Sequence, residues 1–323
     1  MFFVKTPLRV SFTGGMTDFP QFFNAHSGSV ISVTIDKYVR IFLNPKFEKG
    51  FRLMYSKTEN VKSVKDIQHK LFKETIKYFK LNDIEIASVG DIPSLGTGLG
   101  SSASFLVGLI RLLNKQKNNK NIDKGDLASL AFHIENNLAK MSCGYQDHFA
   151  ASYCGLNNYI FNKNKFIVKK INLSKDFLGS FEKSIKLFYL NKSSKSHGIT
   201  NKNIKLLKKK DNLSYLLEIL DITKESKKHL LKEDLVNFSK MIDKSWELKK
   251  RYQESFIDYD DCNKFIEYAK QKGAYCGKLL GAGKRGFVMI IGPSKVLSNI
   301  ANDTKLISIP TKFVMKSEPI LNL

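Results

Sequence analysis

The chain contains little cysteine, and its cysteines are not spaced for metal or redox chemistry. Only four occur among the 323 residues, at Cys143, Cys154, Cys262 and Cys276, and no pair has C-x-x-C spacing. This pattern gives no support to a zinc ribbon or a thioredoxin-type site. A chain of this length buries enough surface to fold without a disulfide framework. We therefore expect reduced cysteines with mostly structural roles.

Long apolar runs are also missing. No segment reaches the roughly 18 consecutive apolar residues that a membrane-spanning helix requires. The first residues lead directly into a patterned segment, whereas a signal peptide has an apolar block there. The hydrophobic share of 42% and the charged share of 26% are typical of a soluble globular protein. These features predict a cytoplasmic protein with no membrane partner.

Acidic residues are scarce relative to basic ones. The chain has 30 Asp and Glu against 53 Lys and Arg, a formal net charge of +23. Such an excess is compatible with nucleic acid, an anionic membrane or a phosphorylated substrate as partner. Lysine and asparagine crowd polar segments such as residues 114–121, without the interleaved aromatic residues of a nucleic-acid-binding stripe. We interpret most of the excess as solvated surface and expect no nucleic-acid partner.

The length predicts about two domains, at roughly 150 residues each. Apolar periodicity predicts strands at residues 8–12, 30–43, 84–86, 185–189, 287–291 and 313–315, and helices at residues 66–79, 101–113, 127–138, 213–231, 235–250 and 262–272. A lysine-rich stretch covers residues 202–210, and no internal repeat is present. The pattern indicates an α+β fold with a domain boundary between residues 155 and 185.

A glycine-rich loop that enters an apolar helix is the most informative segment. Residues 93–103 read Pro-Ser-Leu-Gly-Thr-Gly-Leu-Gly-Ser-Ser-Ala. Glycine lets backbone N–H groups approach an anion, and the helix N-terminus adds its dipole. Ser101 or Ser102 adds a hydroxyl for a phosphate or for Mg²⁺. The loop has neither the lysine of a Walker A motif nor the spacing of a dinucleotide fingerprint. It predicts a different phosphate-binding loop, and the alternative is a tight turn with a serine N-cap.

Two further motifs flank this loop in the chain. Residues 7–20 read Pro-Leu-Arg-Val-Ser-Phe-Thr-Gly-Gly-Met-Thr-Asp-Phe-Pro, and residues 278–287 read Lys-Leu-Leu-Gly-Ala-Gly-Lys-Arg-Gly-Phe. In order and in sequence, the three segments resemble the motifs of the GHMP kinases, the superfamily of galactokinase, homoserine kinase and mevalonate kinase. The resemblance implies an enzyme that uses ATP and Mg²⁺. It also implies an N-terminal mixed α/β nucleotide-binding domain, residues 1–170, and a C-terminal ferredoxin-like α+β domain, residues 171–323.

Smaller segments narrow the resemblance. Residues 35–39 (Ile-Asp-Lys-Tyr-Val), 246–250 (Trp-Glu-Leu-Lys-Lys) and 273–278 (Gly-Ala-Tyr-Cys-Gly-Lys) resemble the D-glycero-D-manno-heptose 7-phosphate kinases of bacterial surface-polysaccharide synthesis. That implies transfer of the ATP γ-phosphoryl group to the anomeric hydroxyl of heptose 7-phosphate, on the path to a nucleotide-activated heptose. Two alternatives remain open: a GHMP kinase for fucose, galactose or another heptose phosphate, and a non-catalytic nucleic-acid-binding protein on this scaffold. A homodimer also remains open.

The same resemblance implies roles for individual residues. Asp147, followed by His148 where the family usually has Gln, is implied to accept the proton of the sugar hydroxyl, and Arg9 to keep Asp147 ionised. Ser102 and Glu135 are the implied Mg²⁺ ligands. The implied nucleotide contacts are Gly96, Gly98, Leu99, Gly100, Ser101, Ser102 and Ala103. The implied substrate contacts are Gly14, Gly15, Thr17, Asp18, Asp147, Gly281, Gly283, Lys284 and Arg285. Taken without the family, the acids also fit as turn caps or solvated side chains, and Arg9 as an ordinary ion pair.

One segment departs from the family. Lys284 and Arg285 stand where relatives have two glycines, so their bulk and charge would disturb a backbone that requires positive φ. We hypothesise that both adopt negative φ and lie near a phosphate, where cations are favourable. The loop at residues 193–197 is interpreted either as part of the substrate wall or as plain surface.

Overall fold

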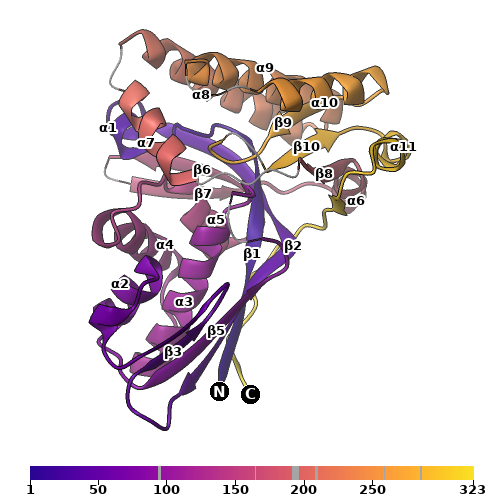
Figure 1. Cartoon of the computed structure of the whole chain (residues 1–323). Coiled ribbons are helices and arrows are strands. Elements are labelled where there is room, and N and C mark those ends of the chain that lie inside the picture. The colour runs from indigo at the N-terminus through magenta and orange to yellow at the C-terminus, as the bar shows by residue number, and fades with distance from the viewer. Residues whose placement is uncertain are drawn as a thin grey trace.

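Two β-sheets, one large and one small, organise the chain (Figure 1). The computed structural model describes residues 1–93, 96–163, 165–190, 196–207, 210–255, 257, 259–283 and 286–323. The large sheet has the order β12-β1-β2-β5-β3-β4, and β6 and β7 extend it from β2. The small sheet has the order β11-β8-β10-β9 and is antiparallel throughout. The predicted α+β class is confirmed.

The strands of the large sheet are β1 (Phe2–Thr13), β2 (Gly28–Pro45), β3 (Phe51–Met54), β4 (Thr58–Val61), β5 (Ile84–Gly90), β6 (Leu156–Asn162), β7 (Lys165–Lys170) and β12 (Leu321–Asn322). Those of the small sheet are β8 (Ile185–Tyr189), β9 (Cys276–Leu279), β10 (Phe287–Ile291) and β11 (Ser308–Pro310). The helices are α1 (Pro20–His26), η1 (Val64–Asp66), α2 (Lys70–Phe79), α3 (Ser101–Asn118), α4 (Lys124–Phe132), η2 (His133–Leu138), α5 (Gln146–Tyr153), α6 (Lys175–Lys183), α7 (Ser196–Leu207), α8 (Lys210–Leu231), α9 (Leu235–Gln253), α10 (Asp260–Gln271) and α11 (Ser294–Thr304).

Strand β1 is the element around which the two halves of the chain meet. It pairs with β2 along its length and is buried without alternation from Thr6 to Thr13. Continuous burial needs cover on both faces of a strand. The cover comes from α3 and α5 of the N-terminal half and from α8 and α9 of the C-terminal half. Polar residues on β1 are therefore held between the two halves.

The hydrophobic core continues across the predicted domain boundary. Phe12 of β1 packs against Phe181 of α6 and Phe238 of α9, with ring centroids 5.5 Å and 5.4 Å away. Both partners belong to the same buried cluster as the apolar residues of α3. Aromatic pairs of this kind add to the free energy gained by area burial. The division into residues 1–170 and 171–323 remains a prediction, with a core shared by both parts.

Several elements differ from the sequence-based expectation. The predicted helix at 127–138 is α4 followed by a π-helical turn, η2, which carries Glu135. The predicted strand at 313–315 was wrong, because the segment makes only an isolated bridge between Phe313 and Ile35. The predicted helix at 66–79 begins at Lys70, since the His69 side chain caps it by accepting from Phe72 N–H. The described part of the lysine-rich stretch lies in α7 and at the start of α8.

The search for membrane spans covered the described residues. Within them, no helix has both the length and the apolar character needed to cross a bilayer.

Candidate active site

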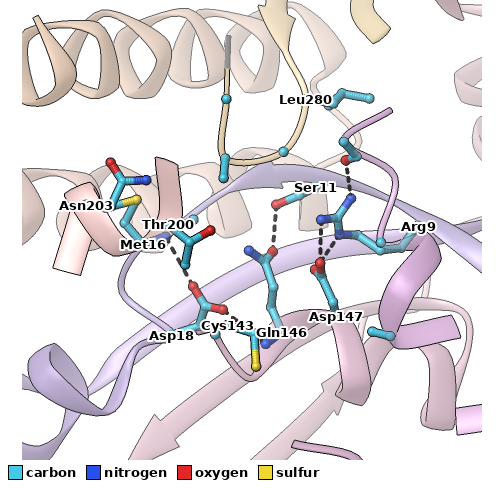
Figure 2. A pocket seen from close by; sticks show the side chains of 18 of the residues that line it. Arg9, Ser11, Met16, Asp18, Cys143, Gln146, Asp147, Thr200, Asn203 and Leu280 are labelled. Carbon is cyan, nitrogen blue, oxygen red and sulfur yellow. Dashed lines mark hydrogen bonds and ion pairs between the residues drawn. The ribbon is translucent and has the colours of Figure 1, made fainter. Parts of the chain in front are cut away.

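One cavity between the two halves gathers most of the predicted site residues. Its walls come from β1 and the loop after it, the glycine-rich loop with the start of α3, the segment before α5, helices α7 and α9, and the loop after β9. In Figure 2, Arg9 and Asp147 lie on one side, and Met16, Thr200 and Asn203 lie on the other. Ser11 and Gln146 stand between them, joined by a 2.9 Å hydrogen bond from Ser11 Oγ.

Arg9 and Asp147 form a two-point ion pair at the cavity wall. Arg9 Nε donates to Asp147 Oδ1 at 2.7 Å, and Arg9 Nη2 donates to Oδ2 at 2.9 Å. The third donor, Nη1, binds Gly98 O at 2.6 Å. Such a fork fixes the orientation of both planar groups. Asp147 lies in the first turn of α5, and its side chain keeps 29% exposure while Arg9 keeps 5%. The carboxylate is therefore held in place yet accessible from the cavity.

The glycine-rich loop places the start of α3 beside this ion pair. Gly100 is the N-cap of α3 with φ of +75°, and a Cβ there would lie 3.5 Å from Asp147 Oδ2 and 3.4 Å from Arg9 Cγ. Among the described residues, no side chain caps this N-terminus. Since Ser101, Ser102 and Ala103 of the first turn line the cavity, the N-terminus of α3 favours an anion there.

A second glycine-rich segment, from the C-terminal half, supports the loop. Gly98 has φ of +78°, and a Cβ there would overlap the backbone of Leu280. Gly281 has φ of +77°, and a Cβ there would overlap Gly98. Phe287 N–H donates to Thr97 O at 3.2 Å, which adds a direct link. These glycines are required because two backbones approach closer than any side chain permits.

Glu135 lies at the centre of a buried polar cluster. Ser102 Oγ donates to Glu135 Oε1 at 2.7 Å, and His148 Nε2 lies 2.7 Å from Oε2. Glu135 lies in the π-helical turn η2, where its side chain is buried. Possible ligand atoms of Glu135, Cys143 and His148 lie within 4.8 Å of one another. Burial raises the pKa of the Cys143 thiol, and the carboxylates of Glu135, Asp147 and Asp18 raise it further. The thiol is therefore neutral rather than nucleophilic.

Asp18 and Thr17 separate into two roles. Asp18 lines the cavity and accepts hydrogen bonds from Met16 N–H and Gln146 N–H, both at 3.1 Å. Burial raises the pKa of its carboxyl group to about 6, against the opposing Gln146 N–H, and the nearby Asp147 adds to the rise. Thr17 is fully buried, and its hydroxyl is occupied by Gly14 O, Ser29 O and Ser29 N–H. Thr17 therefore holds the loop, in contrast to the sugar contact expected for it.

The structure thus brings together most of the predicted set and separates a few members from it. The predicted residues that line the cavity are Arg9, Gly15, Asp18, Gly96, Gly98, Gly100, Ser101, Ser102, Ala103, Glu135, Asp147, Gly281 and Gly283. Gly14, Thr17 and Leu99 are not among the lining residues. Leu99 is fully buried in the core, and its carbonyl accepts from Arg9 N–H. Lys284, Arg285 and residues 193–195 lie outside the described residues, so the expectations for them stay predictions.

Two lysines in the cavity wall had no role assigned from the sequence. Lys249 of α9 donates from Nζ to Gly281 O, and Lys278 of β9 donates to Phe12 O at 2.7 Å. A signal for Lys278 was present, because it lies in a strand that is otherwise apolar or glycine. The sequence gave no such signal for Lys249, because Lys244, Lys250 and other cations surround it in α9.

Comparisons with known proteins agree with this geometry. Residues 63–155 match the GHMP kinases N terminal domain. The chain is 26% identical to a D-glycero-alpha-D-manno-heptose 7-phosphate kinase of Campylobacter jejuni, covering 90% of this chain and 89% of the other. It is 28% identical to a galactokinase of Pyrococcus furiosus over 88% and 86% of the two chains. The fold is similar to a crystal structure of a D-glycero-D-manno-heptose 1-phosphate kinase from Bacteroides thetaiotaomicron, with a TM-score of 0.81 and 20% identity over 100% and 99%.

Proposed function

Since this chain belongs to the GHMP kinases and transfers phosphate to a hydroxyl group of a sugar, we propose that its acceptor is D-glycero-D-manno-heptose 7-phosphate. ATP would supply the phosphoryl group, and the product would be the 1,7-bisphosphate. The observation that carries the proposal is the Arg9–Asp147 ion pair beside the start of α3, which places a carboxylate next to an anion site. The similarity to the Campylobacter enzyme along nearly the whole chain supports the choice of sugar.

In the proposed reaction Asp147 accepts the proton of the anomeric hydroxyl. The sugar oxygen forms a bond to the γ-phosphorus, the bond from that phosphorus to the β,γ-bridging oxygen breaks, and ADP leaves with the electron pair. Arg9 orients the carboxylate of Asp147 through its two hydrogen bonds. The proton then passes from Asp147 to solvent. Phosphoryl transfer depends mainly on positioning and on charge neutralisation, and both are provided by groups in this wall.

The nucleotide phosphates would bind at the glycine-rich loop. Gly96, Gly98 and Gly100 line the cavity and all have positive φ, a backbone conformation found in anion-binding loops. Ser101, Ser102 and Ala103 form the first turn of α3, where the helix dipole favours negative charge. Backbone donors of this kind recognise phosphate without adding a cation.

The cluster around Glu135 fits a magnesium ion. Mg²⁺ prefers hard oxygen ligands, and Ser102 Oγ and Glu135 Oε1 lie 2.7 Å apart in the cavity wall. When bound there, the ion would neutralise charge on the nucleotide phosphates. His148 keeps hold of the other carboxylate oxygen of Glu135 and so orients it. We propose Ser102 and Glu135 as the protein ligands of Mg²⁺.

Replacing Glu135 by glutamine tests this assignment. E135Q keeps a carbonyl oxygen for Ser102 but loses the charge, so the Mg²⁺ concentration for half-maximal activity should rise by about 10-fold or more. Titration with Mg²⁺ at saturating ATP measures this half-maximal concentration. The control is E267Q, which removes an exposed carboxylate from α10 and should leave the Mg²⁺ midpoint at the wild-type value. The same midpoint in E135Q and wild type would assign Mg²⁺ to other groups.

A substrate panel tests the proposed acceptor. The purified enzyme is incubated with ATP, Mg²⁺ and, in turn, heptose 7-phosphate, free heptose, galactose and fucose, and ADP release and product mass are recorded. Heptose 7-phosphate should give the highest kcat/KM and a bisphosphate product. A higher kcat/KM for galactose, the sugar named for the Pyrococcus relative, would show that heptose 7-phosphate is not the preferred acceptor. The proposed type of reaction, phosphoryl transfer to a sugar, would still stand.

The proposed reaction also suggests a physiological setting. We propose that the enzyme acts in the cytoplasm, in the synthesis of nucleotide-activated heptose for a capsule or lipopolysaccharide. Small sugar phosphate and ATP are then its partners, without nucleic acid or membrane.

A further inference from the structure

Lys278, which is buried, and Lys249, which is half-buried, both line the cavity. Lys278 keeps only 7% exposure, inside a strand whose four residues are all buried. Its ammonium group donates to Phe12 O, at the end of β1 that leads into the loop of Gly15 and Asp18. The ammonium group of Lys249 donates to Gly281 O and lies 5.6 Å from the ring centre of Trp246. Both lysines come from the C-terminal half of the chain.

Their positive charge is not balanced within the protein. Among the described residues, neither lysine forms an ion pair, whereas Arg9 is paired with Asp147. An ammonium group has three donors, and the carbonyl bond in each lysine uses one. Burial, together with the nearby Arg9, lowers the pKa of Lys249 to about 8. Burial, together with the nearby Lys249 and Arg9, lowers the pKa of Lys278 to about 7. Buried charges without a counterion are costly, which points to an anion bound in the functioning enzyme.

The position of the pair favours the acceptor over the nucleotide. The glycine-rich loop and the α3 N-terminus already supply donors for nucleotide phosphates, and they belong to the N-terminal half. The lysines share the C-terminal wall with Thr200, Asn203 and Ser245, whose uncharged polar groups suit sugar hydroxyls. A neutral sugar would leave two cations uncompensated in that wall.

We propose that Lys249 and Lys278 bind a phosphate group carried by the acceptor and thereby select a sugar phosphate over a free sugar. The inference rests on the proposed function, because it assumes that this cavity binds the acceptor. It assigns acceptor specificity to two residues of α9 and β9, in addition to any contribution from Lys284 and Arg285. A dianionic phosphate supplies the counterion that both ammonium groups lack, through charge-assisted hydrogen bonds.

Acceptor preference in lysine variants tests the proposal. The wild type is compared with K249M, K278M and K278R on heptose 7-phosphate and on free heptose, at saturating ATP. The ratio of the two kcat/KM values should fall by about 30-fold or more in each methionine variant, mainly through KM for the phosphorylated acceptor. K278R keeps the charge and should retain more of the ratio than K278M. K244M, an exposed lysine on the same helix, should show the wild-type ratio.

The outcomes separate this inference from the proposed function. If wild type phosphorylates heptose 7-phosphate but the ratio persists in K249M and K278M, the inference is overturned and the function stands. A rise in KM for ATP with an unchanged ratio also overturns it, since the lysines then serve the nucleotide. The wild type could instead prefer another sugar phosphate and not act on heptose 7-phosphate. If the ratio of kcat/KM for that sugar phosphate to kcat/KM for its free sugar then falls in K249M and K278M, the proposed acceptor is wrong and the inference stands.

A binding measurement gives a second readout that does not depend on turnover. Trp246 is the single tryptophan of the chain and lies next to Lys249, so its fluorescence should report an anion bound there. Titration with inorganic phosphate should give a saturable change in the wild type, with the midpoint shifted about 10-fold or more in K278M. No saturable change, or the same midpoint in both proteins, contradicts the site. Far-UV circular dichroism confirms that K278M is folded.

Discussion

Replacing Asp147 by asparagine is expected to lower kcat by about 10²–10⁴-fold, the range contributed by a positioned general base. The carboxylate accepts two hydrogen bonds from Arg9, at 2.7 Å and 2.9 Å. Asparagine is uncharged, and only one of its two terminal atoms accepts hydrogen bonds, so the proton acceptor, the ion pair and one of the two hydrogen bonds from Arg9 are lost together. The measurement is the initial rate of ADP release with heptose 7-phosphate at saturating ATP.

The control for Asp147→Asn is D126N, the same chemical change at an exposed residue of α4. D126N should have wild-type kcat. The KM for ATP should change by less than about 3-fold in D147N. The side chain of Asp147 forms its hydrogen bonds with Arg9 and not with the glycine-rich loop. A D147N enzyme with more than about a tenth of the wild-type kcat would exclude general-base catalysis by this residue.

A methyl group added at Gly98 should disable the nucleotide site. Gly98 has φ of +78°, and its Cβ would overlap the backbone of Leu280 in the loop after β9. Backbone cannot yield as a flexible side chain can, so the glycine-rich loop must move by the order of 1 Å, a displacement that costs about 100-fold in rate. We expect kcat/KM for ATP to fall by about 100-fold or more in G98A. Steady-state kinetics with ATP as the varied substrate measures this.

The matched control is Gly179→Ala. Gly179 lies in α6, and an added Cβ meets nothing within 4 Å. Alanine is favoured over glycine in a helix by about 0.8–1 kcal/mol, so G179A should be as active as wild type and slightly more stable. To separate a local defect from global unfolding, melting temperatures are recorded with and without ATP. If G98A folds and ATP raises its melting temperature as much as that of the wild type, the loop tolerates the methyl group.

The parts of the site that are local in sequence could be predicted from the sequence. The glycine-rich loop and the apolar helix that follows it lie in one short segment with recognisable spacing. Strands β8 and β10 were predicted at their observed bounds and helix α3 at its observed start, because apolar periodicity decides them, whereas α3 continues five residues beyond its predicted end. Asp147 and Arg9, 138 positions apart, were brought together only by the family resemblance, and the structure gives the contact.

The remaining features depend on contacts that no local pattern encodes. The helical spacing of the sequence gives Glu135 no special place, and its contacts with Ser102 and His148 come from two other helices. Thr17 carries a hydroxyl at the expected place, but the backbone of Ser29, from another strand, occupies it. Lys249 resembles its surface neighbours in sequence and differs from them only because α9 packs over the end of β1.

The contact between Gly98 and the loop around Gly281 also constrains how the molecule assembles during synthesis. The glycine-rich loop leaves the ribosome early, but the backbone of Leu280 and the N–H group of Phe287 that support it are made near the end of the chain. Contacts between such distant segments form late, because closing a long loop is entropically costly. A nascent or truncated chain therefore lacks the support for the glycine-rich loop, so the proposed nucleotide site would form only once the C-terminal half of the chain is in place.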